Sequence, residues 1–379
     1  MKKYKDPILQ ARRDAVESYA RKVCSVLWRT DKDLVYTITA DTEPRFVPET
    51  RRLVICAGQL YSGVAYSYNA GSLGAWMDLA GEPDEDGIYQ ISGLNWKSLS
   101  GASTTARIGL DCSSLVVRSW QSIGVGIPAY ATESMTEANG FLPVGQYNAP
   151  KDTYVNTIED CAQNGEQVMY KAYAKLQKAD AIVMRKPGFG HTRLVCKVVA
   201  YRLPNGQIDG DNSFVFCHEQ CAGQKHRLLS DEFEEELTPF CRVERPFTFK
   251  TLFETGYLPV TIRELIDPAP MEEAKVQDSV IVPTIDNLFT GTITANRGLD
   301  AVIITIRGGN TVQRSLCRPL RSRTEDFAFE MKQFLEDGPE KTLGVIDLAA
   351  LSAGSYTCTV EAREVCGQLH TVRNFAFEI

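Results

Sequence analysis

The sequence predicts an α+β protein in which a mixed region of helices and strands is followed by an all-β sandwich. Apolar residues recur at helical spacing over residues 8–29, which predicts an N-terminal amphipathic helix. Two prolines and an acidic pair interrupt the pattern over residues 267–273 and predict a linker. Beyond it, short strand-like runs alternate with turn residues. We therefore expect three segments, which cover residues 1–266, 267–276 (the linker) and 277–379.

The C-terminal segment is predicted to be an immunoglobulin-like β-sandwich that serves as an accessory domain. Its strand-like runs are short and number seven in about 100 residues, as is typical of that fold. A glycine pair followed by Asn310 predicts a turn, and Tyr356 resembles a tyrosine corner. All four tryptophans precede this segment, so an antibody-type core is not expected. The predicted strands cover residues 280–282, 290–295, 301–307, 326–329, 344–347, 356–362 and 370–377.

Charge and composition exclude several classes of partner. The 379 residues carry a net charge of −7, which argues against binding of nucleic acid or an anionic membrane by bulk electrostatics. No apolar run approaches the roughly 18 residues of a membrane span, and the start of the chain lacks the apolar core of a secretory leader. We therefore expect a cytoplasmic location or export by a non-classical route. The oligomeric state stays open.

The cysteines also bear on the cellular compartment. There are eleven, an odd number, and they are scattered singly along the chain. Such a pattern does not resemble the disulfide framework of a secreted protein. We expect reduced thiols in a reducing compartment.

One cysteine stands where a helix would activate it. Residues 109–116 read Gly-Leu-Asp-Cys-Ser-Ser-Leu-Val, and the apolar residues from Leu115 onward follow helical spacing. Asp111 is a natural N-cap, so Cys112 falls in the first turn, directly before Ser113. There the unpaired backbone N–H groups and the helix dipole favour a thiolate and can hold an oxyanion. Cys112 is therefore a candidate nucleophile of a hydrolase; the alternative is a small buried apolar residue.

A cysteine nucleophile needs a base, and the chain has four histidines. His370 falls in the predicted sandwich, where we expect a structural or solvated residue. His191 follows a glycine-containing loop and opens a strongly β-like run. A second such run contains His218 near its end, and the turn residues between the two runs predict an antiparallel hairpin. The hairpin would bring His218 close to His191.

The register of this hairpin decides which polar residue orients the base. With a two-residue turn at positions 205–206, His218 lies diagonal to His191 on the same face of the sheet. A longer loop shifts the pairing and puts Glu219 or Gln220 in that place.

A metal site is the alternative use of this region. Cys217, His218, Cys221 and His226 lie within ten residues, a spacing not far from that of a zinc knuckle. The group lacks a Cys-x-x-Cys pair and a second pair of ligands, so we expect neither a metal nor a cofactor. The acidic run over residues 231–236 predicts a solvated helix face.

Taken together, these residues resemble the NlpC-type cysteine peptidases, papain-like enzymes of bacterial cell-wall metabolism. The family's nucleophile motif, Asp-Cys-Ser-Gly-Leu-Val, is similar to residues 111–116, with a serine in place of the glycine. A Gly-Val-Ala-Tyr stretch resembles the family's Gly-Val-Pro-Tyr and places Tyr66 at its tyrosine. Asp180 before a hydrophobic stretch, and then His191 opening a strand, follow the family's order. The resemblance covers about residues 55–225.

The resemblance implies that residues 1–266 contain a papain-like peptidase domain. Cys112 would attack an amide carbonyl as a thiolate, His191 would transfer the proton, and His218 would orient His191. The backbone N–H of Cys112, aided by Tyr66, would stabilise the oxyanion before the thioester acyl-enzyme is hydrolysed. The implied substrate is a peptide stem of peptidoglycan, often cleaved between D-glutamate and a diamino acid.

Two other functions stay open. The first is an amidase or acyltransferase of the same fold that acts on a non-wall substrate. The second is a catalytically silent wall-binding module, against which the intact Cys112 and His191 argue. The candidate site residues are Cys112, His191 and His218 as catalytic groups, Tyr66, Asp111 and Ser113 near the substrate, and Glu219 and Gln220 as alternatives for the third polar residue.

Overall fold

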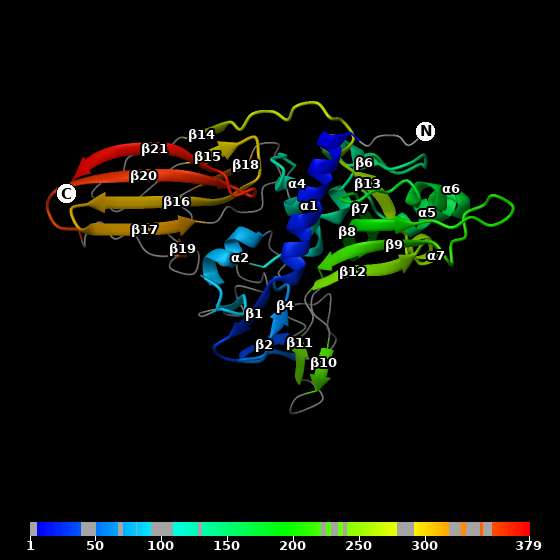
Figure 1. Ribbon diagram of the computed structural model, residues 1–379, viewed down its shortest axis with the longest axis horizontal. Helices are drawn as coiled ribbons and strands as arrows, with labels where there is room; N and C mark the ends of the chain where they lie inside the picture. Colours follow the sequence, from blue (N-terminus) through cyan, green and yellow to red (C-terminus); the bar gives the residue numbers. More distant parts are fainter. Residues whose placement is uncertain are drawn as a thin grey trace.

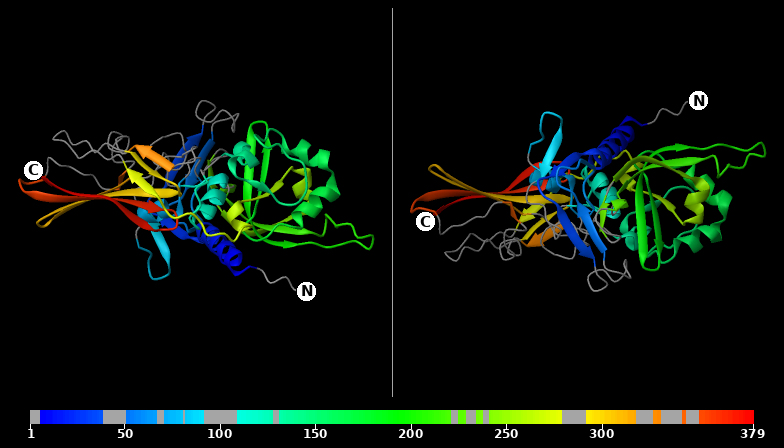
Figure 2. Two further views of the ribbon diagram at one scale, coloured as in Figure 1. Left: turned by 90° about the horizontal axis from the view of Figure 1, so that it is seen from above. Right: turned by 90° about the horizontal axis from the view of Figure 1, so that it is seen from below.

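The computed structural model is a mixed protein of helices and mainly antiparallel sheets, compatible with the predicted α+β class (Figure 1). Among the described residues, no strand before residue 262 pairs with a strand after residue 275. Figure 2 shows the strands of residues 181–220 and those after residue 275 at opposite ends of an elongated molecule, with the N-terminal strands between them. The structure describes residues 6–38, 51–66, 71–80, 82–91, 109–127, 131–220, 225–228, 234–237, 241–278, 292–317, 327–330, 342–343 and 351–379.

The first group is built around a six-stranded antiparallel sheet in the order β12-β9-β8-β7-β13-β6. Its inner strands are mostly buried, and all four residues of β13 are inaccessible to solvent. Such near-continuous burial is typical of strands covered on both faces. In spatial order the strands are β12 (Cys241–Thr248), β9 (Phe214–Gln220), β8 (Phe189–Val199), β7 (Ala181–Lys186), β13 (Leu258–Thr261) and β6 (Leu142–Pro143).

Helix α1 (Pro7–Ser25) contacts β8, β9 and β12 of this sheet. It begins at Asp6, whose carboxylate accepts hydrogen bonds from the first backbone N–H groups, and Pro7 suits the first helical position. The helix predicted over residues 8–29 is too long, because Leu27–Thr30 forms strand β1. The chain turns at Val26, so the last apolar residues of the helical pattern belong to the strand instead.

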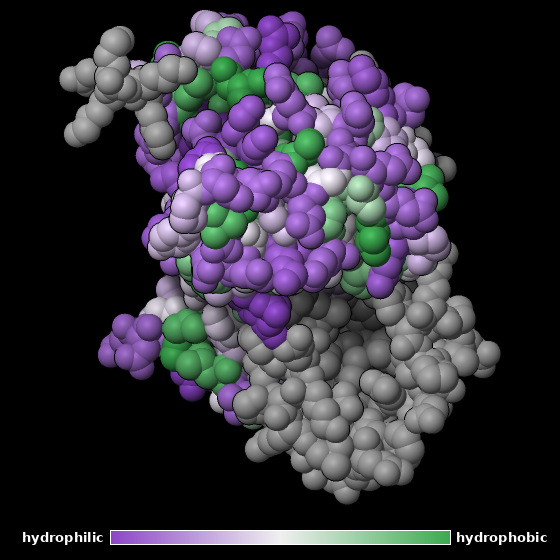
Figure 3. Space-filling view, turned by 90° about the vertical axis from the view of Figure 1, so that its right-hand side faces the viewer, coloured by the Kyte–Doolittle hydropathy of each residue, from purple (hydrophilic) through white to green (hydrophobic). Residues whose placement is uncertain are grey.

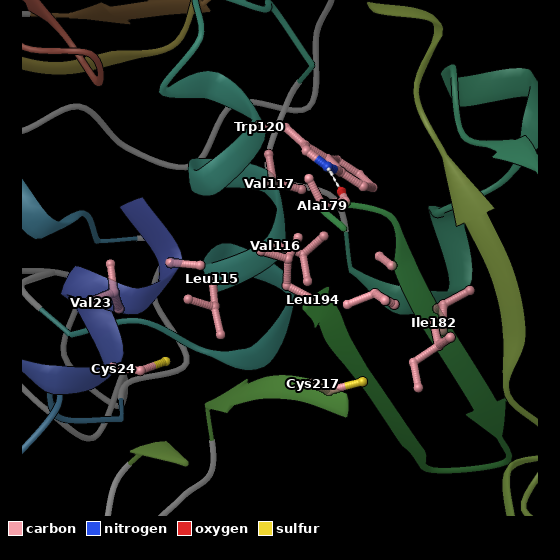
Figure 4. Packing of buried hydrophobic residues seen from close by; sticks show 14 of the residues in the cluster. Val23, Cys24, Leu115, Val116, Val117, Trp120, Ala179, Ile182, Leu194 and Cys217 are labelled. Carbon is pink, nitrogen blue, oxygen red and sulfur yellow. Dashed lines mark hydrogen bonds between the residues drawn. The ribbon is translucent and has the colours of Figure 1, made fainter. Parts of the chain in front are cut away.

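Helix α4 (Cys112–Gln121) is buried along its whole length and contacts α1, β8 and β9. Figure 4 shows Leu115 and Val116 between Val23 of α1 and Leu194 of β8. At the other end of the helix, Trp120 Nε1 donates a hydrogen bond to a backbone carbonyl oxygen just before β7, at 2.8 Å. The packing therefore fixes α4, and with it the residue at its N-terminus, relative to the sheet.

Short helices complete this part of the molecule. Helix α5 contacts β7, α6 and α7, and α7 also contacts β12. The end of the molecule seen in Figure 3 is mainly hydrophilic where the structure describes it, and its apolar residues form small separate groups. The helices are α2 (Leu73–Ala80), α5 (Thr157–Asn164), α6 (Glu166–Tyr173) and α7 (Phe249–Glu254), with single 3₁₀ turns η1 (Thr132–Ser134), η2 (Glu137–Asn139) and η3 (Arg263–Leu265).

Two small sheets lie beside the main one, in the orders β4-β1-β5 and β10-β11-β3-β2. The acidic run predicted to be a helix face forms strand β11 over its last residues, while residues 231–233 lie outside the described part. Pairing with β3 and β10 outweighs the helix propensity of glutamate here. The strands not yet given are β2 (Leu34–Ile38), β3 (Arg51–Ile55), β4 (Tyr61–Ser62), β5 (Ile88–Ile91), β10 (Lys225–Leu228) and β11 (Glu234–Leu237).

The second group comprises sheets in the orders β14-β15-β18 and β19-β17-β16-β20-β21. Five predicted strands overlap β15, β16, β18, β20 and β21, and the other two, 280–282 and 344–347, lie outside the described residues. The sequence did not predict the short strands β14 and β19, nor β17, whose centre is polar. The strands are β14 (Val276–Asp278), β15 (Thr292–Ala295), β16 (Leu299–Gly308), β17 (Thr311–Cys317), β18 (Phe327–Glu330), β19 (Thr342–Leu343), β20 (Ser355–Glu364) and β21 (Leu369–Glu378).

These strands enclose a hydrophobic core of their own, separate from that of the first group. Tyr356 lies in it, and its hydroxyl donates to the carbonyl oxygen of Ser352 at 2.8 Å, which is the contact that a tyrosine corner makes. Asn310 lies in the predicted turn between β16 and β17.

Buried charges join the two groups. Arg363 of β20 donates to both carboxylate oxygens of Asp78 in α2, at 2.9 and 2.6 Å, and to Asp300 of β16 at 3.1 Å. Arg118 of α4 donates to the carbonyl oxygen of Leu299 at 3.3 Å. The β-rich group is therefore tied to α2 and to the C-terminal half of α4.

The linker is also held at its start. Arg12 of α1 donates to the carbonyl oxygens of Glu264 and Asp267, both at 2.8 Å, and of Ala269 at 2.7 Å. From the other side, Asn296 donates to the carbonyl oxygen of Glu273 at 2.9 Å. Both halves of the protein thus contact this segment.

Candidate active site

Cys112 is the first residue of α4, as the sequence predicted. Asp111 precedes it in an extended conformation, and its Oδ1 accepts hydrogen bonds from Ser114 N at 2.6 Å and from Ser113 Oγ at 2.8 Å. The N-cap role of Asp111 is confirmed. Ser113 belongs to the cap, since its hydroxyl is directed to Asp111. Cys112 is 7% exposed at a helix end where the backbone N–H groups and the dipole favour a thiolate.

The backbone of Tyr66 lies beside the residue that leads into this cap. Tyr66 forms an isolated parallel bridge with Leu110, and Leu110 N donates to the carbonyl oxygen of Ala65 at 3.2 Å. The predicted closeness of Tyr66 to the nucleophile segment is therefore present at the level of the backbone. Tyr66 is half-buried against the main core.

His191 lies near the start of β8 and pairs with Glu219 of β9. Its Nε2 is 3.0 Å from Glu219 Oε1, and its side chain is 14% exposed. Leu194 is opposite His218 in the sheet, so Arg193 is opposite Glu219. Arg193 and His191 are two positions apart on β8 and share a face of the sheet, so Glu219 lies on the face that carries His191. Glu219, one of the two predicted alternatives, is therefore the polar residue that contacts the base.

The prediction that His218 orients His191 is wrong. A two-residue turn would have put His218 opposite Arg193, but His218 pairs with Leu194, and this shift of one residue turns its side chain to the other face. There it is fully buried, with Nε2 3.1 Å from Glu17 Oε1 of α1. The loop between β8 and β9 is longer than a two-residue turn, and a bulge shifts the register.

Gln220, the other alternative, also lies away from the base. Its side chain is buried, and its Nε2 donates to the carbonyl oxygen of Val64 at 2.7 Å. This contact ties the end of β9 to the segment that leads to Tyr66.

Two arginines hold Glu219 in its ionised form. Oε1 accepts from Arg193 Nε at 3.0 Å, and Oε2 accepts from Arg245 Nη1 at 2.9 Å. Burial alone would raise the pKa of Glu219, but the hydrogen bond from His191 and the two guanidinium charges lower it far below its usual value. An ionised carboxylate can only accept, so Glu219 accepts a hydrogen bond from the Nε2–H group of His191, and Nδ1 is left as the basic nitrogen of the ring.

The charge state of His191 also suits a base. Burial lowers the pKa of His191 below its ordinary value, and the positive charge of Arg193 adds to this effect, although the hydrogen bond to Glu219 opposes it. The imidazole is therefore neutral at neutral pH and can accept a proton.

Tyr257, directly before β13, packs against Arg193, which in turn binds Glu219. The guanidinium carbon of Arg193 lies 4.4 Å from the Tyr257 ring centroid and 4.0 Å from that of Phe247 on its other side. Burial raises the pKa of Tyr257, and the charges of Arg193, Glu219 and Cys112 all act on its hydroxyl. Cys112 and Glu219 therefore both lie close enough to Tyr257 for their charges to affect its hydroxyl.

Four residues of the site were not predicted from the sequence: Arg193, Arg245, Phe247 and Tyr257. Only Arg193 carries a signal, because it lies two positions after His191 and therefore on the same face of a strand. The other three come from segments that reach the site through sheet pairing alone.

Asp180, which the resemblance matches to the aspartate before the family's histidine strand, lies away from the candidate catalytic residues. Its carboxylate accepts from Arg13 Nη1 at 2.8 Å and from Thr261 Oγ1 at 2.6 Å, so it holds α1 to the sheet.

The proposed zinc ligands do not converge where they can be described. Cys217 and His218 are neighbours on β9 and point to opposite faces of the sheet. Within the described part of the chain, no group of three His, Cys, Asp or Glu residues could hold a metal ion. The nine cysteines whose side chains the structure describes form no disulfide bond with one another. No helix in these ranges is both long and apolar enough to cross a membrane.

No protein-family model, no curated protein and no solved structure matches this chain.

Proposed function

We propose that this chain is a cysteine hydrolase that cleaves an amide bond through a Cys112 thiolate and an acyl-enzyme. The observation that carries the proposal is the hydrogen bond from His191 Nε2 to the ionised Glu219, on two strands that the helix beginning at Cys112 contacts. A nucleophile, a neutral base and a group that orients the base are the three parts that such chemistry needs.

The reaction follows from these roles. His191 Nδ1 takes the proton of the Cys112 thiol, and the resulting thiolate attacks the amide carbonyl carbon while backbone N–H groups at the start of α4 stabilise the oxyanion. The C–N bond then breaks as His191 returns the proton to the leaving amine. A water molecule, deprotonated by His191, hydrolyses the thioester and restores the thiol. Glu219 keeps the ring in the required tautomer and stabilises the imidazolium.

The proposed substrate is a peptide stem of peptidoglycan, and the proposed fold is papain-like with an immunoglobulin-like accessory domain. The order of motifs supports this choice: Tyr66, then residues 111–116, then Asp180 and His191. The antiparallel sheet with α4 packed on it, and the tyrosine-corner contact of Tyr356, are compatible with those two folds.

Digestion of purified muropeptides, read by mass spectrometry, tests the proposal. The wild type is expected to release stem-peptide fragments, and Cys112→Ala to lose activity by about 1,000-fold or more. Cys366→Ser is the matched control, because Cys366 is an exposed cysteine in the β-rich region and should not affect cleavage. Cleavage by Cys112→Ala at the wild-type rate would refute the role of Cys112.

The same samples decide between substrates. If none of the proteins cleaves muropeptides while Cys112 is alkylated by iodoacetamide below neutral pH, the nucleophile is active and the substrate is another amide or acyl donor. If Cys112 is also unreactive, the protein is not a cysteine hydrolase.

A further inference from the structure

Arg245 of β12 offers a charged group at the rim of the proposed site. Its side chain is 39% exposed, whereas that of Arg193 is 10% exposed and lies between two aromatic rings. Within the described residues, the one hydrogen bond of Arg245 goes to Glu219 Oε2, and its guanidinium carbon lies 4.9 Å from the Phe247 ring centroid. No other described residue accepts a hydrogen bond from its remaining N–H groups.

The charges around His191 do not cancel. Two guanidinium groups face the single carboxylate of Glu219, and His191 is neutral because burial lowers its pKa. These four described residues (Arg193, Arg245, Glu219 and His191) therefore carry one net positive charge before the thiol ionises, in a protein whose total charge is −7. A positive charge in a partly desolvated site attracts anions more strongly than one in open solvent.

We propose that Arg245 makes this site select substrates that carry a carboxylate close to the bond being cleaved. The inference rests on the proposed function, since it concerns the site that contains Cys112. A guanidinium group matches a carboxylate in shape and can donate two parallel hydrogen bonds to it. The buried Arg193 already neutralises the charge of Glu219, so the exposed N–H groups of Arg245 can bind a substrate carboxylate.

A pair of small alkylating reagents tests this without knowledge of the substrate. Iodoacetate and iodoacetamide both form a carbon–sulfur bond with a thiolate and release iodide, and they differ in carrying a carboxylate or a neutral amide. Trypsin releases Cys112 in the peptide spanning residues 108–118, which contains no other cysteine. Mass spectrometry of this peptide gives both rates for Cys112 alone.

The measured quantity is the rate with iodoacetate divided by the rate with iodoacetamide, relative to the same ratio for N-acetylcysteine. We expect this normalised ratio to be about 3 to 10 in the wild type at low salt, and to fall as salt screens the positive charge. Arg245→Gln should lower the normalised ratio most of the way to one, and Arg245→Lys should leave most of the wild-type ratio in place. Arg202→Gln removes the same charge from the exposed loop after β8 and should leave it unchanged.

The outcomes separate the two proposals. A reactive Cys112 whose ratio equals that of N-acetylcysteine, or is unchanged in Arg245→Gln, refutes carboxylate selection and leaves the hydrolase intact. A Cys112 that reacts with neither reagent below neutral pH refutes both. Thermal unfolding shows whether each variant is folded. If Arg245→Gln is unfolded, the test uses Arg245→Lys, which keeps the charge. A fall of its rate ratio to that of N-acetylcysteine would then refute a role based on charge.

Discussion

Glu219→Gln is expected to lower kcat by at least about 100-fold, because the base loses the group that fixes its tautomer and stabilises its protonated form. Glu219 Oε1 is 3.0 Å from His191 Nε2 and accepts from no other histidine in the described part of the chain. Steady-state kinetics on the substrate identified from muropeptides would measure the loss. A variant with wild-type kcat would contradict the role given to Glu219.

The same substitution should move the acidic limb of the pH–rate profile. The reaction needs neutral His191, and burial places its pKa below the ordinary value of about 6.5, so activity should be lost only as the pH falls below that value. The Glu219 carboxylate raises the pKa of His191, so its removal should shift the limb to still lower pH. The measurement is kcat/KM against pH for both proteins.

His218→Gln is the control for both measurements. His218 contacts Glu17 of α1 on the other face of the sheet, so kcat and the acidic limb should stay close to those of the wild type. We expect a lower melting temperature instead, because a buried hydrogen bond is altered. A shifted acidic limb in His218→Gln, together with an unshifted one in Glu219→Gln, would show that His218 orients the base.

Arg13→Met is expected to lower the free energy of unfolding by about 3–5 kcal/mol, the usual cost of leaving one partner of a buried ion pair uncompensated. The Arg13 and Asp180 side chains are 5% and 2% exposed, and Arg13 also donates to the carbonyl oxygens of Lys178 and Leu265. Urea unfolding, followed by tryptophan fluorescence, would give the change.

Lys178→Met is the matched control, because the ion pair of Lys178 with Asp14 lies at the surface. Its effect on unfolding should be small, as surface ion pairs contribute little. The double variant Arg13→Met/Asp180→Leu should recover part of the loss, since it leaves no buried charge. Equal stability of Arg13→Met and Lys178→Met would contradict the importance of the buried pair.

The features that depend on local sequence could be predicted. Asp111 and Cys112 fall at the start of a helix because a capping residue and the first apolar residues of a helical pattern occur within a few positions of each other. His191 opens a strand for similarly local reasons. Most of the described strands of the β-rich region also follow from short alternating runs, and polar β17 was missed because its alternation is weak.

The rest of the site depends on pairing over long distances in the sequence. Glu219 and His218 are adjacent on one strand, and a register shift of one residue decides which of them meets His191. That shift arises from the loop and the bulge, neither of which the sequence pattern fixes. Arg245 and Tyr257 reach the site because β12 pairs with β9 and β13 with β7, which no local signal predicts.

The contacts of Arg12 and Arg13 have a consequence for how the chain folds during synthesis. These residues of α1 bind carbonyl oxygens at Glu264, Leu265 and Ala269, at sequence separations of 252 to 257. At about 5–20 residues per second, a ribosome needs roughly 13–50 s to make the intervening chain. Helix α1 therefore emerges well before these partners and cannot complete its docking until they appear. Its apolar face is a natural target for a chaperone during that interval.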